Sequence, residues 1–167
     1  LNISALLHDI GMKERQRQLL LYLAETFQDR ADEIQQVTIQ KHDPCLNRID
    51  RLVLRLTAHA YAHLGRMYSR LEKNPTAAEE NFKHAIYYMP DDDPNIYHMA
   101  GTSLLDKLKQ QWDKDIDLPK EELGQKYSLY ELDIKLASER FDYSCHYGSP
   151  DYGFPSKLDL LFSYLQF

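Results

Sequence analysis

The chain has 167 residues, of which 43% are hydrophobic and 28% charged, so it is long enough to bury the core of one domain. A formal net charge of −6 argues against a general nucleic-acid binder, which usually carries a broad basic surface. No apolar run approaches the ~20 residues that span a bilayer, so we expect no membrane insertion. The two cysteines have no metal-site or disulfide-framework spacing, and we expect a cytoplasmic protein without a cofactor.

Helical spacing of apolar residues predicts the first elements of the chain. A short helix is expected to end at Gly11, which would act as its C-cap, and a second helix is expected from Met12 to about Gln36. Asp43 and Pro44 form a good helix start, because Asp is a favoured N-cap and Pro a favoured first helical residue. The helix that follows is predicted to run from Cys45 to about Leu71.

Proline-containing breaks divide the next part of the chain. Asn74-Pro75-Thr76 is expected to begin a helix that lasts to Met89. The acidic segment 90–94 breaks the pattern, and a helix from about Asn95 to Trp112 follows. Asp91, Asp92 and Asp93 are interpreted as a turn that caps this helix. Residues 113–122 are highly charged and contain a proline, which predicts an exposed loop.

The remaining residues predict two further helices. One is expected from about Glu121 to Cys145, followed by a turn-rich connection over 146–155 and a last helix from about Pro155. Because no segment has a convincing strand pattern, the predicted fold is all-α. The chain starts on Leu and stops inside an apolar run, so we expect a single all-α domain cut from a longer protein. Its expected parts are 1–43, 44–90, 91–145 and 146–167.

One part of the chain carries a repeat pattern with a packing rationale. Small residues leave room where two helices cross closely, and aromatic residues fill the space that remains. The first-helix positions are Tyr61, Leu64, Gly65 and Tyr68, and the second-helix positions are Ala78, Phe82, Ala85 and Pro90. The second set is displaced by one residue, which falls in the Glu72–Thr76 turn. This pattern resembles the tetratricopeptide repeat, most strongly over residues 58–101.

A second unit departs from the repeat. The first-helix pattern restarts 36 positions later with Tyr97, Ala100, Gly101 and Leu104. The charged segment then intervenes, and the small–aromatic–small spacing returns only with Ala137, Phe141 and Ser144. We interpret this as a second helix delayed by an insertion of roughly two dozen residues. The resemblance, which covers residues 58–145, implies an irregular antiparallel helical-hairpin array of about six to seven helices.

The resemblance also implies a binding groove. In tetratricopeptide proteins, first-helix positions beside the packing residues line a concave surface. Those positions here are His59, Ala62, His63, Arg66, Ser69 and Arg70 in the first unit, and Asn95, His98, Met99, Thr102, Leu105 and Asp106 in the second. The cationic and imidazole side chains suit an acidic peptide or a carboxylate. We therefore predict a partner-binding groove formed by His59, His63, Arg66, Arg70, His98 and Thr102.

The expected function is a non-catalytic scaffold that contacts a protein or peptide, or other domains of its own chain. The carboxylate clamp that some tetratricopeptide proteins use for chaperone tails needs Lys and Asn at particular groove positions. This chain has Ala62, Arg66, His98 and Thr102 there, which disfavours that partner. Degenerate repeats of this kind occur in large STAND-type signalling NTPases, and residues 78–101 resemble a segment of the sterile-alpha-motif antiviral proteins. A structural spacer within such an NTPase is therefore an alternative.

An enzymatic alternative rests on the segment Leu6–Gly11. Its His8 and Asp9 are similar to the central motif of HD-domain phosphohydrolases, where His and Asp bind a metal. Those enzymes also need a histidine on a preceding helix and an aspartate on a later one, and no residue before His8 in this sequence can supply that histidine. We therefore favour a helix end capped by Gly11. His59 and His63 have the i, i+4 spacing of a metal pair, but no third ligand is evident and we predict no metal site.

Overall fold

The computed structural model describes residues 12–41, 46–89, 91–148 and 150–166. These residues form six helices and no strand, which confirms the all-α prediction for the part of the chain that is described. The helices are α2 (Lys13–Lys41), α3 (Arg48–Arg70), α4 (Pro75–Tyr88), α5 (Pro94–Asp115), α6 (Lys120–Tyr147) and α7 (Pro150–Gln166). The predicted helix ending at Gly11, the Asp43-Pro44 helix start and Pro90 lie outside the described residues.

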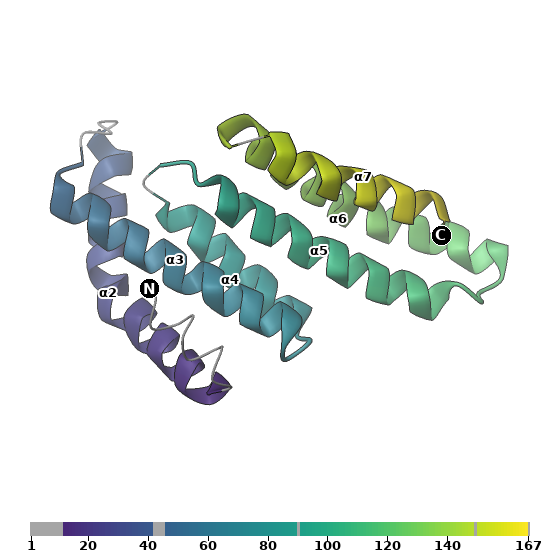
Figure 1. Cartoon of the computed structure of the whole chain (residues 1–167), viewed down its shortest axis with the longest axis horizontal. Helices are drawn as coiled ribbons and strands as arrows, with labels where there is room; N and C mark the ends of the chain where they lie inside the picture. Colours follow the sequence, from purple (N-terminus) through teal and green to yellow (C-terminus); the bar gives the residue numbers. More distant parts are fainter. Residues whose placement is uncertain (1–11, 42–45, 90, 149, 167) are drawn as a thin grey trace.

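The helices pack with their neighbours along the chain as a row of hairpins. α3 pairs with α4 and α5 with α6, while α2 packs on α3 and α7 packs on α6. In Figure 1 the α3, α5 and α7 helices form the nearer layer, and α4 and α6 lie behind them. α5 also contacts both helices of the first hairpin, so it joins the two halves of the row.

Side-chain caps set the starts of three helices. Asn47 accepts hydrogen bonds from the backbone N–H groups at the start of α3, so this helix begins at Arg48 rather than near Cys45. Asn74 caps α4 and Asp93 caps α5, each followed by a proline at the first helical position. The predicted starts of α4 and α5 are therefore close to the observed ones.

The turn between α3 and α4 is where the resemblance to the tetratricopeptide repeat places one extra residue. Lys73 has a φ of 53°, in the left-handed region that L-residues seldom adopt. The backbone N–H of Asn74 then donates to the carbonyl of Tyr68 over 2.9 Å. A single left-handed residue thus reverses the chain and positions the Asn74 cap.

The predicted exposed loop in the charged segment 113–122 is present but shorter than expected. α5 continues to Asp115 and α6 begins at Lys120, so only residues 116–119 connect them. The reason is a buried contact that local charge does not reveal. The carboxylate of Asp115 is buried and accepts hydrogen bonds from Lys126 Nζ and Tyr130 Oη. These hydrogen bonds hold α5 and α6 together beside the short connection over 116–119.

The second hairpin is a longer version of the first rather than a hairpin with an inserted loop. A Cβ atom added at Gly65 would lie 3.0 Å from the Phe82 ring, and one added at Gly101 would lie 2.7 Å from the Phe141 ring. Each first helix therefore crosses its second helix at a glycine that faces a buried phenylalanine. The residues that separate Gly101 from Phe141 lengthen both helices beyond this crossing.

The predicted turn-rich connection over 146–155 is also wrong, because α7 begins at Pro150 and contains Pro155. A proline inside a helix removes one backbone hydrogen bond and is locally unfavourable. Packing outweighs this cost here. A Cβ atom at Gly153 would lie only 2.7 Å from Cys145 Sγ, so α7 lies very close to α6 at this point. The Lys157–Asp142 ion pair, at 2.6 Å, holds the same two helices together.

The core is distributed along the row in three clusters. One joins α2 and α3, a second joins α2 through α5, and a third joins α5, α6 and α7 around Trp112 and Phe141. Within the described residues, we find no helix whose length and apolarity would allow it to cross a membrane.

Candidate functional site

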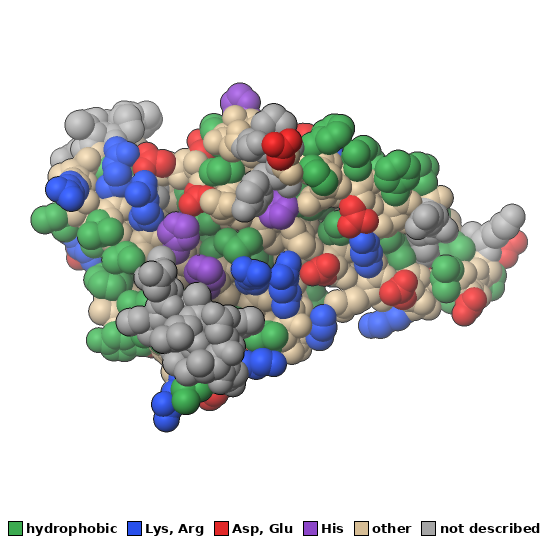
Figure 2. All heavy atoms as spheres, viewed as in Figure 1, with side chains coloured by type: hydrophobic (Ala, Val, Ile, Leu, Met, Phe, Trp, Pro, Cys, Tyr) green, Lys and Arg blue, Asp and Glu red, His purple; other side chains and the backbone are tan. Residues whose placement is uncertain are grey.

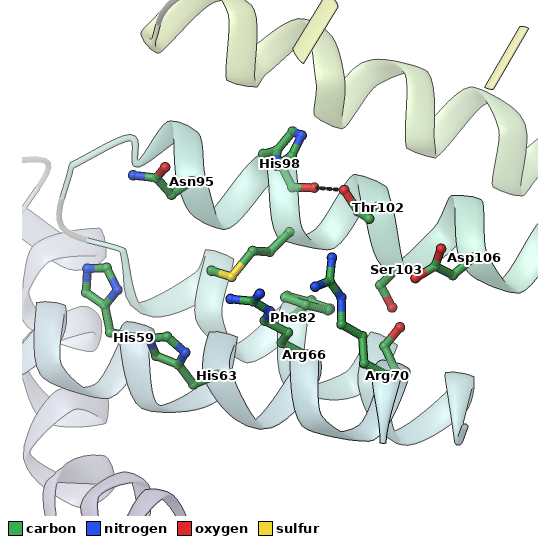
Figure 3. A pocket seen from close by; sticks show the side chains of 12 residues that line it. His59, His63, Arg66, Arg70, Phe82, Asn95, His98, Thr102, Ser103 and Asp106 are labelled. Atoms are coloured by element: carbon green, nitrogen blue, oxygen red, sulfur yellow. Dashed lines mark hydrogen bonds between the residues drawn. The ribbon is translucent and has the colours of Figure 1, made fainter. Parts of the chain in front are cut away.

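A hollow of about 370 Å³ lies between α3 and α5, with the ring of Phe82 from α4 among its lining groups (Figure 3). The structure places all six residues of the predicted groove around this hollow: His59, His63, Arg66, Arg70, His98 and Thr102. Ser69, Asn95, Met99 and Asp106, which the repeat register also assigned to the groove, line it as well.

Two residues expected at the groove lie elsewhere. Ala62 is 0% exposed and Leu105 is 4% exposed, and both belong to core clusters. The lining face of each helix is therefore narrower than the repeat register implied. Phe82 and Ser103 line the hollow but were not predicted. Phe82 was assigned only to packing. Because Gly65 has no side chain, the Phe82 ring lies directly against α3 and also reaches the hollow. The glycine at position 65 was therefore the sequence feature from which the place of Phe82 in the hollow could have been predicted.

Arg66 and Arg70 supply the positive charge of the site. They lie one turn apart on α3, and their guanidinium groups extend over the hollow in Figure 3. Burial and the charge of Arg70 lower the pKa of Arg66, although a guanidinium stays protonated at any physiological pH. Among the described residues, no carboxylate forms an ion pair with either arginine.

The histidines of the site differ in their partners. Nε2 of His59 lies 3.3 Å from Oδ2 of Asp93, which also caps α5. His63 is half-buried, and its pKa is lowered mainly by burial and further by His59 and Arg66. Burial also lowers the pKa of His98, with a contribution from Arg70. We expect His63 and His98 to be neutral at neutral pH and to gain a proton when an anion approaches.

His98 also connects the hollow to α7. Its Nε2 lies 3.0 Å from Ser156 Oγ, and Thr102 Oγ1 donates a hydrogen bond of 2.9 Å to the His98 carbonyl. One wall of the hollow is thereby held by contacts with the last helix. Asp106, an acidic residue, lines the same wall.

The acidic side chains in the turn before α5 contact basic side chains of α3. Asp91 forms ion pairs with Arg51 at 2.8 Å and with Arg55 at 3.2 Å. Asp93 caps α5 and faces His59. This arrangement agrees with the prediction that the turn caps the next helix.

Metal ligands do not converge in the described part of the chain. No group of three or more His, Cys, Asp or Glu side chains there could hold an ion, so His59 and His63 have no third ligand among the described residues. The His8-Asp9 motif lies outside those residues. Comparison of the chain with protein-family models, curated proteins and solved structures found no match.

Proposed function

We propose that this chain is a non-catalytic, tetratricopeptide-like scaffold whose hollow between α3 and α5 binds an acidic segment of a protein. The observation that carries the proposal is the pair of arginines over the hollow, for which the described residues supply no acidic partner. Five other arginines are paired with carboxylates: Arg17, Arg30, Arg51, Arg55 and Arg140. Arg15 and Arg48 have no such partner among the described residues, but both are exposed and lie outside the hollow.

The chemistry of the lining suits side-chain carboxylates. A guanidinium presents a planar fork of N–H donors that matches a carboxylate, and such charge-assisted hydrogen bonds are among the stronger ones in proteins. Phe82 and Met99 add apolar surface between the polar groups, which favours contact with the aliphatic part of a peptide. A volume of about 370 Å³ accommodates a few side chains rather than a folded domain.

The repeat-like construction supports the tetratricopeptide-like assignment. Both hairpins place a glycine of the first helix against a buried phenylalanine of the second, and the hollow lies between the two first helices. A spacer role without an independent ligand would need no such site. Binding measurements therefore separate the scaffold proposal from the spacer alternative.

Charge reversal at the two arginines is expected to weaken binding of an acidic peptide at least about tenfold, equivalent to a loss of about 1.4 kcal/mol. The probe is a fluorescent peptide rich in Asp and Glu with blocked ends, and the reference peptide carries Asn and Gln instead. Fluorescence anisotropy compares the wild type with Arg66→Glu/Arg70→Glu. The control variant Arg48→Glu/Lys83→Glu makes the same change in net charge at exposed positions outside the hollow. Equal losses in the two variants would show non-specific attraction and refute the site.

Affinity for the acidic peptide is expected to rise as the pH falls from about 7.5 to about 5.5. The pKa values of His63 and His98 are lowered in the free protein, and a bound carboxylate raises them. Binding therefore takes up protons and strengthens on acidification, while peptide carboxylates with a pKa of about 4 stay charged.

The variant His63→Gln/His98→Gln should flatten this dependence. The lowered pKa values also mean that the fold itself loses stability as the pH falls below about 6.5, because the unfolded chain binds protons more readily. Thermal unfolding at each pH therefore accompanies the titration. An affinity that does not change over this range in the wild type would contradict the assigned role of the two histidines.

A further inference from the structure

The outer face of α7 is apolar. Five large apolar side chains on this face are exposed, with exposed fractions between 38% for Leu158 and 78% for Leu165. The stripe consists of Phe154, Leu158, Leu161, Phe162 and Leu165. The opposite face of the helix buries Leu160 against α5 and α6. Figure 2 shows hydrophobic side chains gathered along α7 at the upper right of the molecule. A helix that is apolar on both faces is normally covered on both.

The spacing of the stripe suits pairing with an identical helix. Phe154, Leu158, Leu161 and Leu165 follow one another at intervals of four, three and four residues. These are alternating d and a positions of a heptad seam. In an antiparallel pair of helices, an a residue of one helix lies beside a d residue of the other. A two-fold axis near Leu160 would place Leu158 beside Leu161 of the second copy and Phe154 beside Leu165 of the second copy.

Charge does not oppose such a contact. The whole chain carries a net charge of −6, which would resist self-association if acidic groups bordered the seam. α7 carries three charged residues, Asp151, Lys157 and Asp159. Asp151 lies one turn before the stripe and has an interaction partner within the chain. Lys157 and Asp159 flank the stripe. Each is held by its own copy, Lys157 by Asp142 at 2.6 Å and Asp159 by Lys109 at 2.8 Å. The seam is therefore apolar and bordered by neutralised pairs.

The size of the face is also sufficient. Five partly exposed Phe and Leu side chains offer on the order of 600 Å², the upper end of the apolar patches found on monomers. Covering this face on two copies would remove on the order of 1,200 Å² from water, where specific interfaces begin. We propose that two copies of this chain associate through an antiparallel, two-fold contact between their α7 helices. This inference is independent of the proposed peptide groove, which lies between α3 and α5.

The first test measures oligomeric state by sedimentation equilibrium from roughly 1 to 100 μM, the range expected for a small interface. The wild type should approach twice its monomer mass of 19.7 kDa. Leu161→Glu/Leu165→Glu should remain monomeric with unchanged helical circular dichroism, because both side chains are exposed in one copy. Leu129→Glu/Leu132→Glu, at 71% and 72% exposed positions of α6, should still dimerise. A monomeric wild type over this concentration range would overturn the proposal.

The second test examines the antiparallel register by disulfide trapping. Single variants Leu158→Cys and Leu161→Cys are prepared in a background in which Cys45 and Cys145 are replaced by Ser. Mild oxidation of an equimolar mixture should cross-link mainly unlike chains, because these two positions face each other across the two-fold axis. Each variant alone should cross-link several-fold less. Preferential cross-linking of like chains would indicate a parallel pair and overturn the proposed geometry.

Discussion

Replacing Phe141 by alanine is expected to lower the free energy of unfolding by about 3–5 kcal/mol, the usual cost of removing a buried aromatic side chain. Phe141 is 0% exposed and lies where α5 and α6 cross, against Gly101. Urea denaturation followed by circular dichroism measures the loss. Leu129→Ala, at a 71% exposed position of the same helix, should change stability by no more than about 0.5 kcal/mol. Similar losses for both variants would contradict the assignment of Phe141 to the core crossing.

A second substitution tests whether the loss comes from this particular contact. Replacing glycine by alanine inside a helix normally stabilises it by roughly 0.5–1 kcal/mol. In the wild type, a Cβ at Gly101 would lie 2.7 Å from the Phe141 ring, so Gly101→Ala should destabilise the fold. In the Phe141→Ala background the ring is absent, and the same change should become stabilising. The sign reversal is the coupling expected of two residues in direct contact.

Replacing Arg140 by methionine is expected to lower the free energy of unfolding by about 3 kcal/mol, the lower end of the cost of breaking a buried ion pair. Both terminal nitrogens of Arg140 bond to Glu79, at 2.7 and 3.0 Å, and Nη1 also lies 3.3 Å from the Ala100 carbonyl. The Arg140 side chain is 6% exposed and that of Glu79 is 20% exposed, so the remaining carboxylate would be left poorly hydrated. The pair joins α4 to α6, the second helices of the two hairpins.

The double variant Glu79→Met/Arg140→Met separates the cost of an orphaned charge from the value of the pair. It should recover most of the stability lost in Arg140→Met, because two apolar side chains leave no uncompensated charge. Lys157→Met breaks a more exposed pair, in which Asp142 is 58% exposed, and should cost no more than about 1 kcal/mol. An additive effect in the double variant would show that the Glu79–Arg140 pair does not act as a unit.

Local sequence signals predicted the elements whose boundaries are set by local chemistry. The Asn74-Pro75 and Asp93-Pro94 starts were close to their observed positions, since cap and proline lie within one turn of the helix end. The exposed loop expected over 113–122 was predicted too long, because the helical state of residues 113–115 depends on Asp115 meeting Tyr130, fifteen residues away. Pro155 was mispredicted for a similar reason, because close packing of α7 on α6 outweighs its local preference.

The sequence predicted those residues of the candidate site that lie together on one face of a single helix. Arg66 and Arg70 lie one turn apart, so their common direction follows from helical spacing once the packing face of α3 is known. His98 lines the same hollow because α5 lies beside α3. Only the alignment with the tetratricopeptide pattern predicted that these two helices are neighbours. Its contact with Ser156 could not be expected from sequence, because helical spacing alone does not indicate which face of the last helix packs against α5.

The division of the apolar core along α5 has a consequence for cooperativity. Ile96 and Ala100 belong to the cluster shared with the first hairpin, while Leu104 to Trp112 belong to the cluster shared with α6 and α7. In linear arrays, stability is approximately a sum of unit and nearest-neighbour terms, and opening can propagate from an end. The rigidity of α5 therefore governs whether the two halves melt as one. Trp112, as the single tryptophan, makes fluorescence a reporter of the second half alone.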